Sequence, residues 1–266
     1  MKFLLVLICS AIVFYSNGQT CTSHALMRKG TQLEYMVYRS DEKKAKLLRL
    51  LFEVANVTDS AGSTYSTIIK KGFGIKDEQK DHYERTIQLQ CDGKNLQLPF
   101  DFIGTDTLYF NDAFPSLIKR NIYYSAATPL EDANYVIPLM LEGVTSLPEG
   151  IRPVVQHIKM TSLKPQPGSD RVKGESGLWE NDFKAIYKIK EIKVAGKETI
   201  TTAAGAFECY ILRADCDCSY EDFPMPTRYT IYYNSEMGIV KMETSVQVGR
   251  NKREQNGYLE LQSVKK

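Results

Sequence analysis

The chain has 266 residues, with 34 basic and 32 acidic side chains and a formal net charge of +2. Such a balanced surface gives no electrostatic reason to expect binding to nucleic acid or to an anionic membrane. The length suits one large β domain or two small ones, and a hydrophobic content of 43% suits an ordinary core.

The N-terminus has the features of a secretory signal peptide. Lys2 gives a positive start, an apolar run covers residues 3–14, and a small-residue exit follows over residues 16–18. A run of about 12 apolar residues is too short for a transmembrane helix, which needs roughly 20. We therefore predict an exported protein, periplasmic or extracellular, that is cleaved after Gly18 and has no transmembrane segment. A lipoprotein is the less favoured alternative, because the residues before Cys21 do not follow the lipoprotein pattern.

The first half of the chain predicts a meander of antiparallel strands. Apolar and polar residues alternate, which is the period of strands with one buried face. The clearest case carries Tyr83, Arg85, Ile87, Leu89 and Cys91 on one face, and Asp92-Gly93 then predicts a hairpin. The strands predicted here cover residues 31–40, 43–57, 63–73, 83–91 and 95–102, of which 43–57 is also compatible with a helix.

One helix is predicted, at residues 111–121. Asp112 can cap it, and Phe114, Leu117 and Ile118 follow at helical spacing. Beyond it, further strands are predicted at 135–141, 154–163, 183–194 and around 258–263.

Residues 165–177 are the most loop-like part of the chain and could divide two domains. Both flanks are strands of similar composition, however, so we predict a single domain over residues 19–266. An added residue near Lys190-Glu191 predicts a β-bulge, and Ala195-Gly196 predicts a turn.

The stretch 194–248 reads as antiparallel sheet around a hairpin loop at residues 234–238, where Gly238 can adopt a positive φ. Helices between the strands, which a parallel α/β fold needs, are absent from the pattern. The predicted fold is therefore mainly β: a strongly curved antiparallel sheet or open half-barrel with one short helix on its concave face.

Five cysteines remain in the predicted mature chain. Export permits disulfides, and the odd count leaves at least one thiol unpaired or intermolecular. The pairing stays open, although Cys216 and Cys218 are too close in sequence to bridge without strain. No C-x-x-C pair or nearby histidine completes a four-ligand site, so we expect no metal. The cysteines that could take part in a disulfide are Cys21, Cys91, Cys209, Cys216 and Cys218.

Motifs for catalysis were not found. The sequence has no G-x-S-x-G, no H-E-x-x-H and no phosphate-binding glycine loop. A carboxylate pair for glycoside cleavage would leave no mark in the spacing. We expect a protein that is not an enzyme and holds no cofactor.

Two short motifs resemble bacterial O-glycosylation sites. They are Asp59-Ser60-Ala61 and Asp106-Thr107-Leu108, which make Ser60 and Thr107 candidate glycosylated residues. The alternative is that both are ordinary turn residues.

The segments K-E-T-I-T-T-A-A-G-A-F-E-C-Y, Y-Y-N-S-E-M-G-I-V-K-M-E-T and a closing L-E-L resemble the TapB-like family of exported bacterial β proteins. Y-V-I-P-L-M-L-E-G-V-T-S-L-P-E resembles the segment that precedes these strands in that family. The likeness covers most of residues 135–261, and Ala203 stands where the family usually has proline. The resemblance implies an exported β protein without established activity, and it implies no catalytic residue.

Two functions fit an exported amphipathic sheet. The favoured one is a binding module that holds a lipid or another hydrophobic small molecule in the curved sheet. The alternative is a structural or assembly protein of the cell envelope that acts through contacts with a protein partner.

Overall fold

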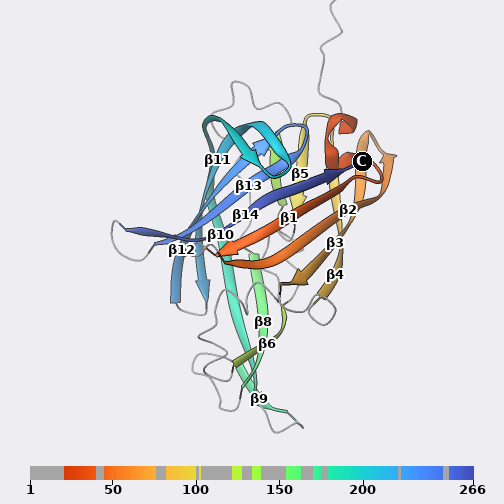
Figure 1. The fold of residues 1–266 in the computed structure, drawn as a ribbon. Coiled ribbons are helices and arrows are strands. Elements are labelled where there is room, and N and C mark those ends of the chain that lie inside the picture. The colour runs from red at the N-terminus through yellow and green to blue at the C-terminus, as the bar shows by residue number, and fades with distance from the viewer. Residues whose placement is uncertain are drawn as a thin grey trace, which may run out of the picture.

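The computed structural model describes residues 21–39, 45–75, 82–99, 102, 122–127, 134–138, 154–162, 170–174, 179–220, 223–247 and 252–266. These residues form a single antiparallel sheet of 14 strands (Figure 1). The strands are β1 Gln32–Arg39, β2 Lys46–Ser60, β3 Ser63–Gly74, β4 His82–Cys91, β5 Asn95–Pro99, β6 Ile122–Ala127, β7 Asn134–Pro138, β8 Val154–Ser162, β9 Asp170–Lys173, β10 Trp179–Thr202, β11 Gly205–Tyr220, β12 Phe223–Asn234, β13 Gly238–Gln247 and β14 Arg253–Lys265.

The sheet is curved and open. Its strand order is β6-β8-β10-β11-β12-β13-β14-β1-β2-β3-β4-β5-β7, with β9 added beside β10. The first and last strands of the chain lie side by side, since β1 pairs with β14. β6 and β7 end the order without pairing to each other. The prediction of a mainly β fold with a strongly curved antiparallel sheet is confirmed.

Helical structure is limited, in the described part of the chain, to two 3-10 turns, η1 Cys21–Ser23 and η2 Ala25–Met27. The helix predicted at 111–121 lies outside the described residues, as does the signal peptide. The predicted single domain over residues 19–266 stays a prediction. β9 lies within the predicted loop at 165–177 and pairs with β10.

Two irregularities bend the long strand β10. A register shift between Ile189 and Glu191 confirms the predicted bulge. The turn predicted at Ala195-Gly196 is wrong, because β10 continues through these residues with a second register shift between Val194 and Gly196. Gly196 has a φ of +154°, so glycine supplies a backbone kink within the strand rather than a reversal.

The two hairpins that the sequence predicts are present. Asp92 Oδ1 accepts hydrogen bonds from the Lys94 and Asn95 amides between β4 and β5. Asn234 Oδ1 accepts from the Glu236 and Met237 amides between β12 and β13. In both turns a short polar side chain takes over backbone donors that would otherwise lack a partner.

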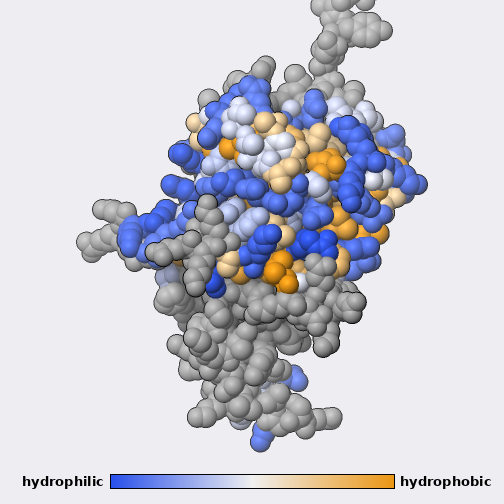
Figure 2. Space-filling view, in the orientation of Figure 1, coloured by the Kyte–Doolittle hydropathy of each residue, from blue (hydrophilic) through white to orange (hydrophobic). Residues whose placement is uncertain are grey.

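The core lies on one face of the sheet, which we call the inner face. Consecutive inward positions of β2, β3 and β4 are buried there, and the 3-10 segment 21–27 packs onto the same face. The opposite face of the front strands is mainly hydrophilic, with small hydrophobic spots (Figure 2). The difference between the two faces follows from the alternation of apolar and polar residues along the strands.

Candidate functional site

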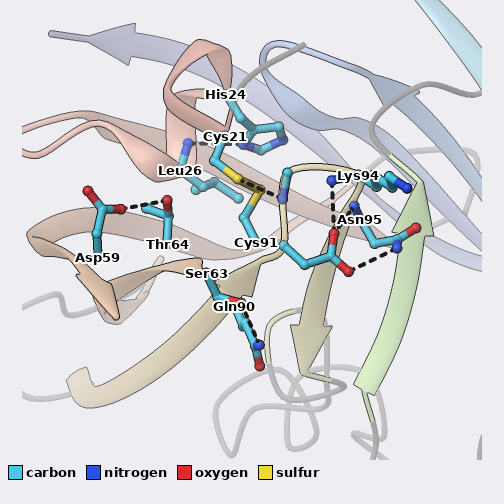
Figure 3. The surroundings of a disulfide bond; sticks show 12 residues. Cys21, His24, Leu26, Asp59, Ser63, Thr64, Gln90, Cys91, Lys94 and Asn95 are labelled. Atoms are coloured by element: carbon cyan, nitrogen blue, oxygen red, sulfur yellow. Dashed lines mark hydrogen bonds between the residues drawn. A yellow bond between two sulfur atoms is a disulfide. The ribbon is translucent and has the colours of Figure 1, made fainter. Parts of the chain in front are cut away.

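The N-terminal segment, residues 21–31, covers one end of the inner face and is fastened to three parts of the sheet. The Ala25 amide donates to the Glu236 carbonyl at 2.6 Å, and the Gly30 amide donates to the Val54 carbonyl at 2.9 Å. Cys21 forms a disulfide with Cys91, 70 residues later, at the end of β4 (Figure 3). Ala25, Leu26 and Met27 are almost fully buried. This end of the sheet is therefore filled by the protein itself.

His24 is the polar centre of this segment and is completely buried. Its Nδ1 accepts from the Leu26 amide at 3.2 Å, and its Nε2 lies 3.0 Å from the Tyr233 hydroxyl. With Nδ1 an acceptor, the neutral ring carries its proton on Nε2 and donates to Tyr233. Burial, helped by Arg28, lowers the pKa of His24 to about 3. A neutral histidine with two satisfied nitrogens points to a structural role.

Two cations break the apolar inner face on β3 and β4. Lys70 is only 1% exposed, and Arg85 is half-buried. The register places Phe52, Lys70 and Arg85 opposite one another on β2, β3 and β4, so their side chains share one face. We call Lys70 and Arg85 the cationic rung. Like charges directly opposite each other on neighbouring strands are unfavourable.

Aromatic rings surround the cationic rung. The Lys70 ammonium lies 5.7 Å from the centre of the Phe52 ring, which packs edge-on against Tyr35 and at 4.5 Å from Phe102. The Arg85 guanidinium lies 5.7 Å from the centre of the Tyr83 ring. Lys70 and Arg85 make further interactions besides these. Cations held against aromatic faces keep part of their attraction for an anion while they lose contact with water.

Tyr83 owes its position to a glycine. A Cβ at Gly72, the residue paired with Tyr83, would lie 2.0 Å from the tyrosine ring. The ring therefore occupies the place that a side chain on β3 would take. Further along the same row of β3, the buried Ser66 hydroxyl makes no hydrogen bond within the described residues.

The site places two cations beside apolar surface. An ammonium and a guanidinium together can hold a carboxylate or a phosphate by charge-assisted hydrogen bonds. The aromatic and aliphatic residues around them suit a hydrocarbon tail. A molecule with both parts, an anionic amphiphile, matches the site.

Lys71, the residue after Lys70, lies on the opposite face of the sheet and has a different environment. Its ammonium lies 3.5 Å from the Glu84 carboxylate and 4.0 Å from the Glu53 carboxylate, and its side chain is 32% exposed. These are ordinary surface ion pairs, which contribute little to stability.

The cysteines do not gather in one place. Cys21 and Cys91 are bonded, whereas Cys209, Cys216 and Cys218 are buried free thiols. In the part of the chain that the structure covers, no three or more His, Cys, Asp or Glu residues cluster as metal ligands would.

The described residues do not include a helix that is long and apolar enough to cross a membrane.

The candidate glycosylation sites fall in different parts of the chain. Ser60 is an exposed residue at the end of β2, beside the turn to β3. Thr107 lies outside the described residues. Glycosylation of Ser60 stays a prediction.

No sequence motif marks the cationic rung, although the position of one of its two residues is unusual in the sequence. Arg85 occupies an apolar row of its strand, between Tyr83 and Ile87, which is an unusual place for arginine. Lys70 is harder to recognise, because the pair Lys70-Lys71 places one lysine on each face and does not say which is buried. His24 belongs to no sequence motif.

The comparisons with known proteins agree with this fold. Residues 176–255 match the DUF3108-like family model, which covers less than half of the chain. A Bacteroides fragilis protein that is considered exported and has a YmcC-like fold superposes with a TM-score of 0.58 at 15% identity. The alignment covers 90% of this chain and 97% of that protein.

A Parabacteroides distasonis protein considered a lipoprotein is equally similar in structure, with a TM-score of 0.58 at 12% identity, over 90% of this chain and 96% of that one. At such identities the similarity shows a shared fold. No curated protein sequence matches the chain. The resemblance to the TapB-like family stays a prediction.

Proposed function

We propose that this protein is exported and, without catalysing a reaction, binds an anionic amphiphile on the inner face of its curved sheet. Lys70 and Arg85 hold the acidic head group, and the neighbouring aromatic residues contact the hydrocarbon. A fatty acid or an acidic lipid has the required chemistry.

The pairing of Lys70 with Arg85 on an otherwise apolar face carries this proposal. A carboxylate or phosphate placed between Lys70 and Arg85 would contact both cations, and the aromatic rings beside them would contact an attached hydrocarbon.

Export is supported from two sides. The N-terminal sequence has the features of a signal peptide, and the disulfide between Cys21 and Cys91 needs an oxidising compartment. The two similar structures come from proteins considered to be exported or a lipoprotein. Because the Cys21 sulfur is bonded to Cys91, it cannot also carry a lipid group.

The second candidate is an assembly protein of the envelope. The observation in its favour is that residues 21–31 fill one end of the inner face with their own side chains. In that case the interior serves stability, and the partner is a protein that contacts the outer face or the loops.

Native mass spectrometry of the protein purified from its own envelope fraction, followed by organic extraction, separates the candidates. We expect an acidic lipid at a ratio close to one per chain, and loss of this species in the double variant Lys70→Met, Arg85→Met. A clean ligand-free mass for the unaltered protein would overturn lipid carriage and favour the assembly protein. The same spectrum reads the cleavage point, expected after Gly18.

A further inference from the structure

Cys216 and Cys218 form a pair of reduced thiols on the inner face of β11. They occupy consecutive inward positions, on either side of the exposed Asp217, and are only 2% and 5% exposed. Their sulfur atoms lie 3.2 Å apart and share a hydrogen bond. The pair lies on a different part of the sheet from the cationic rung, which β3 and β4 carry.

Polar groups on the next strand face this pair. The Thr227 and Tyr229 hydroxyls donate hydrogen bonds to the Cys218 sulfur, and the Cys218 thiol donates to the Cys216 sulfur. Thr227 lies directly opposite Cys216 in the register between β11 and β12. The two thiols thus lie beside hydroxyl donors within an apolar surrounding.

The strand backbone favours a bridging ion over a disulfide. Alternate residues of a strand are about 6.6 Å apart, because each rises about 3.3 Å. Disulfides usually have Cα atoms about 4.4–6.8 Å apart, most often about 5.5–6 Å, so a bond here would lie near the upper end of that range. An ion bound by two thiolates at about 2.3 Å each holds the sulfur atoms up to about 4.6 Å apart. Rotation of the two side chains about their Cα–Cβ bonds is the movement that would widen the present sulfur–sulfur distance of 3.2 Å.

We propose that Cys216 and Cys218 form a two-thiolate binding site for a soft monovalent metal ion of the copper(I) class. Binding replaces two S–H bonds with two metal–sulfur bonds and releases two protons, and the resulting complex carries one negative charge. The Thr227 and Tyr229 hydroxyls donate to that charge. Thiolates select soft ions, and a third or fourth ligand, which zinc would need, is absent among the described residues.

Titration with copper(I) against a competing chromophoric chelator, under nitrogen and with the Cys21–Cys91 disulfide intact, tests the site. We expect one ion per chain, two protons released per ion, and a sulfur-to-copper charge-transfer band in the ultraviolet. Cys216→Ser and Cys218→Ala should each lower the affinity at least tenfold. Cys209→Ser is the matched control, because Cys209 is a buried free thiol that lies away from the pair, with its sulfur directed to the Phe207 carbonyl.

The outcomes are distinct. Equal loss of binding in Cys209→Ser, or no binding that competes with the chelator, would overturn the proposal. So would a second disulfide between Cys216 and Cys218, seen as an intact mass 4 Da below that of the fully reduced chain and assigned by peptide mapping. The proton count needs only the unaltered protein, so the test survives a variant that does not fold.

Discussion

Lys70 and Lys71 are adjacent in β3, yet they face opposite sides of the sheet and have opposite environments. Lys70 is buried beside the Phe52 ring, whereas Lys71 reaches the carboxylates of Glu53 and Glu84 at the surface. Removing the charge of Lys70 or of Lys71 therefore changes the net charge equally but alters opposite faces of the sheet, so the two variants can be compared directly.

Lys70→Met should lower the affinity for a fluorescent long-chain fatty acid at least tenfold, which corresponds to about 1.4 kcal/mol. A charge-assisted hydrogen bond to a carboxylate contributes about that much or more. Lys71→Met should leave the affinity within about twofold, since its ammonium faces away from the inner face. Equal losses in the two variants would show that only the overall charge matters. Methionine keeps the length and apolar body of lysine, so packing is preserved.

The disulfide between Cys21 and Cys91 should account for a large part of the stability. It closes a loop with a sequence separation of 70, for which the chain-entropy relation gives about 4 kcal/mol. The double variant Cys21→Ser, Cys91→Ser should lose about that much in guanidinium unfolding, and added reductant should have no further effect on it. Unchanged stability of the double variant would mean that hydrogen bonds alone hold the N-terminal segment. A mass 2 Da below the reduced chain, with no acyl group on Cys21, is expected for the unaltered protein.

The sequence was sufficient for the sheet because alternation is a local signal. Residues 83–91 and the hairpin around Gly238 could be located from period and turn chemistry alone. Gly196 was misread because glycine marks turns and kinks within strands alike, and only the pairing with β11 shows that the strand continues. The partners of His24 and Cys21 lie 209 and 70 residues away. Such contacts depend on the assembly of the whole sheet, which no local pattern encodes.

Gly238 should tolerate alanine less well than Gly62, although both have a positive φ, +90° and +81°. At Gly62 a Cβ would meet nothing within 4 Å, so Gly62→Ala carries only backbone strain of about 1–2 kcal/mol. At Gly238 a Cβ would lie 3.3 Å from His24 Cε1 and 3.4 Å from its Nε2. We expect Gly238→Ala to cost about 1 kcal/mol more in urea unfolding, since the ring must shift from Tyr233. Equal costs at the two positions would mean that His24 can move freely.

His24 should make the fold sensitive to acid. Its pKa of about 3 in the folded protein lies below the ordinary value of 6.5. Between these two pH values His24 is protonated in the unfolded chain and neutral in the folded protein. The stability linked to this residue is complete above about pH 6.5 and is lost as the pH falls toward about 3, by about 1.4 kcal/mol per pH unit.

Between pH 7 and pH 5, the unaltered protein should therefore lose about 2 kcal/mol more than His24→Gln. Glutamine does not titrate, but its amide can still accept from the Leu26 amide and donate toward Tyr233. Urea unfolding at several pH values measures the difference, and comparison of the two proteins cancels the carboxylates and the other histidines. Parallel curves would show that His24 takes up its proton inside the fold. His24 would then have to be charged beside Tyr233, and its hydrogen bonds in the neutral form would not explain how the N-terminal segment is held.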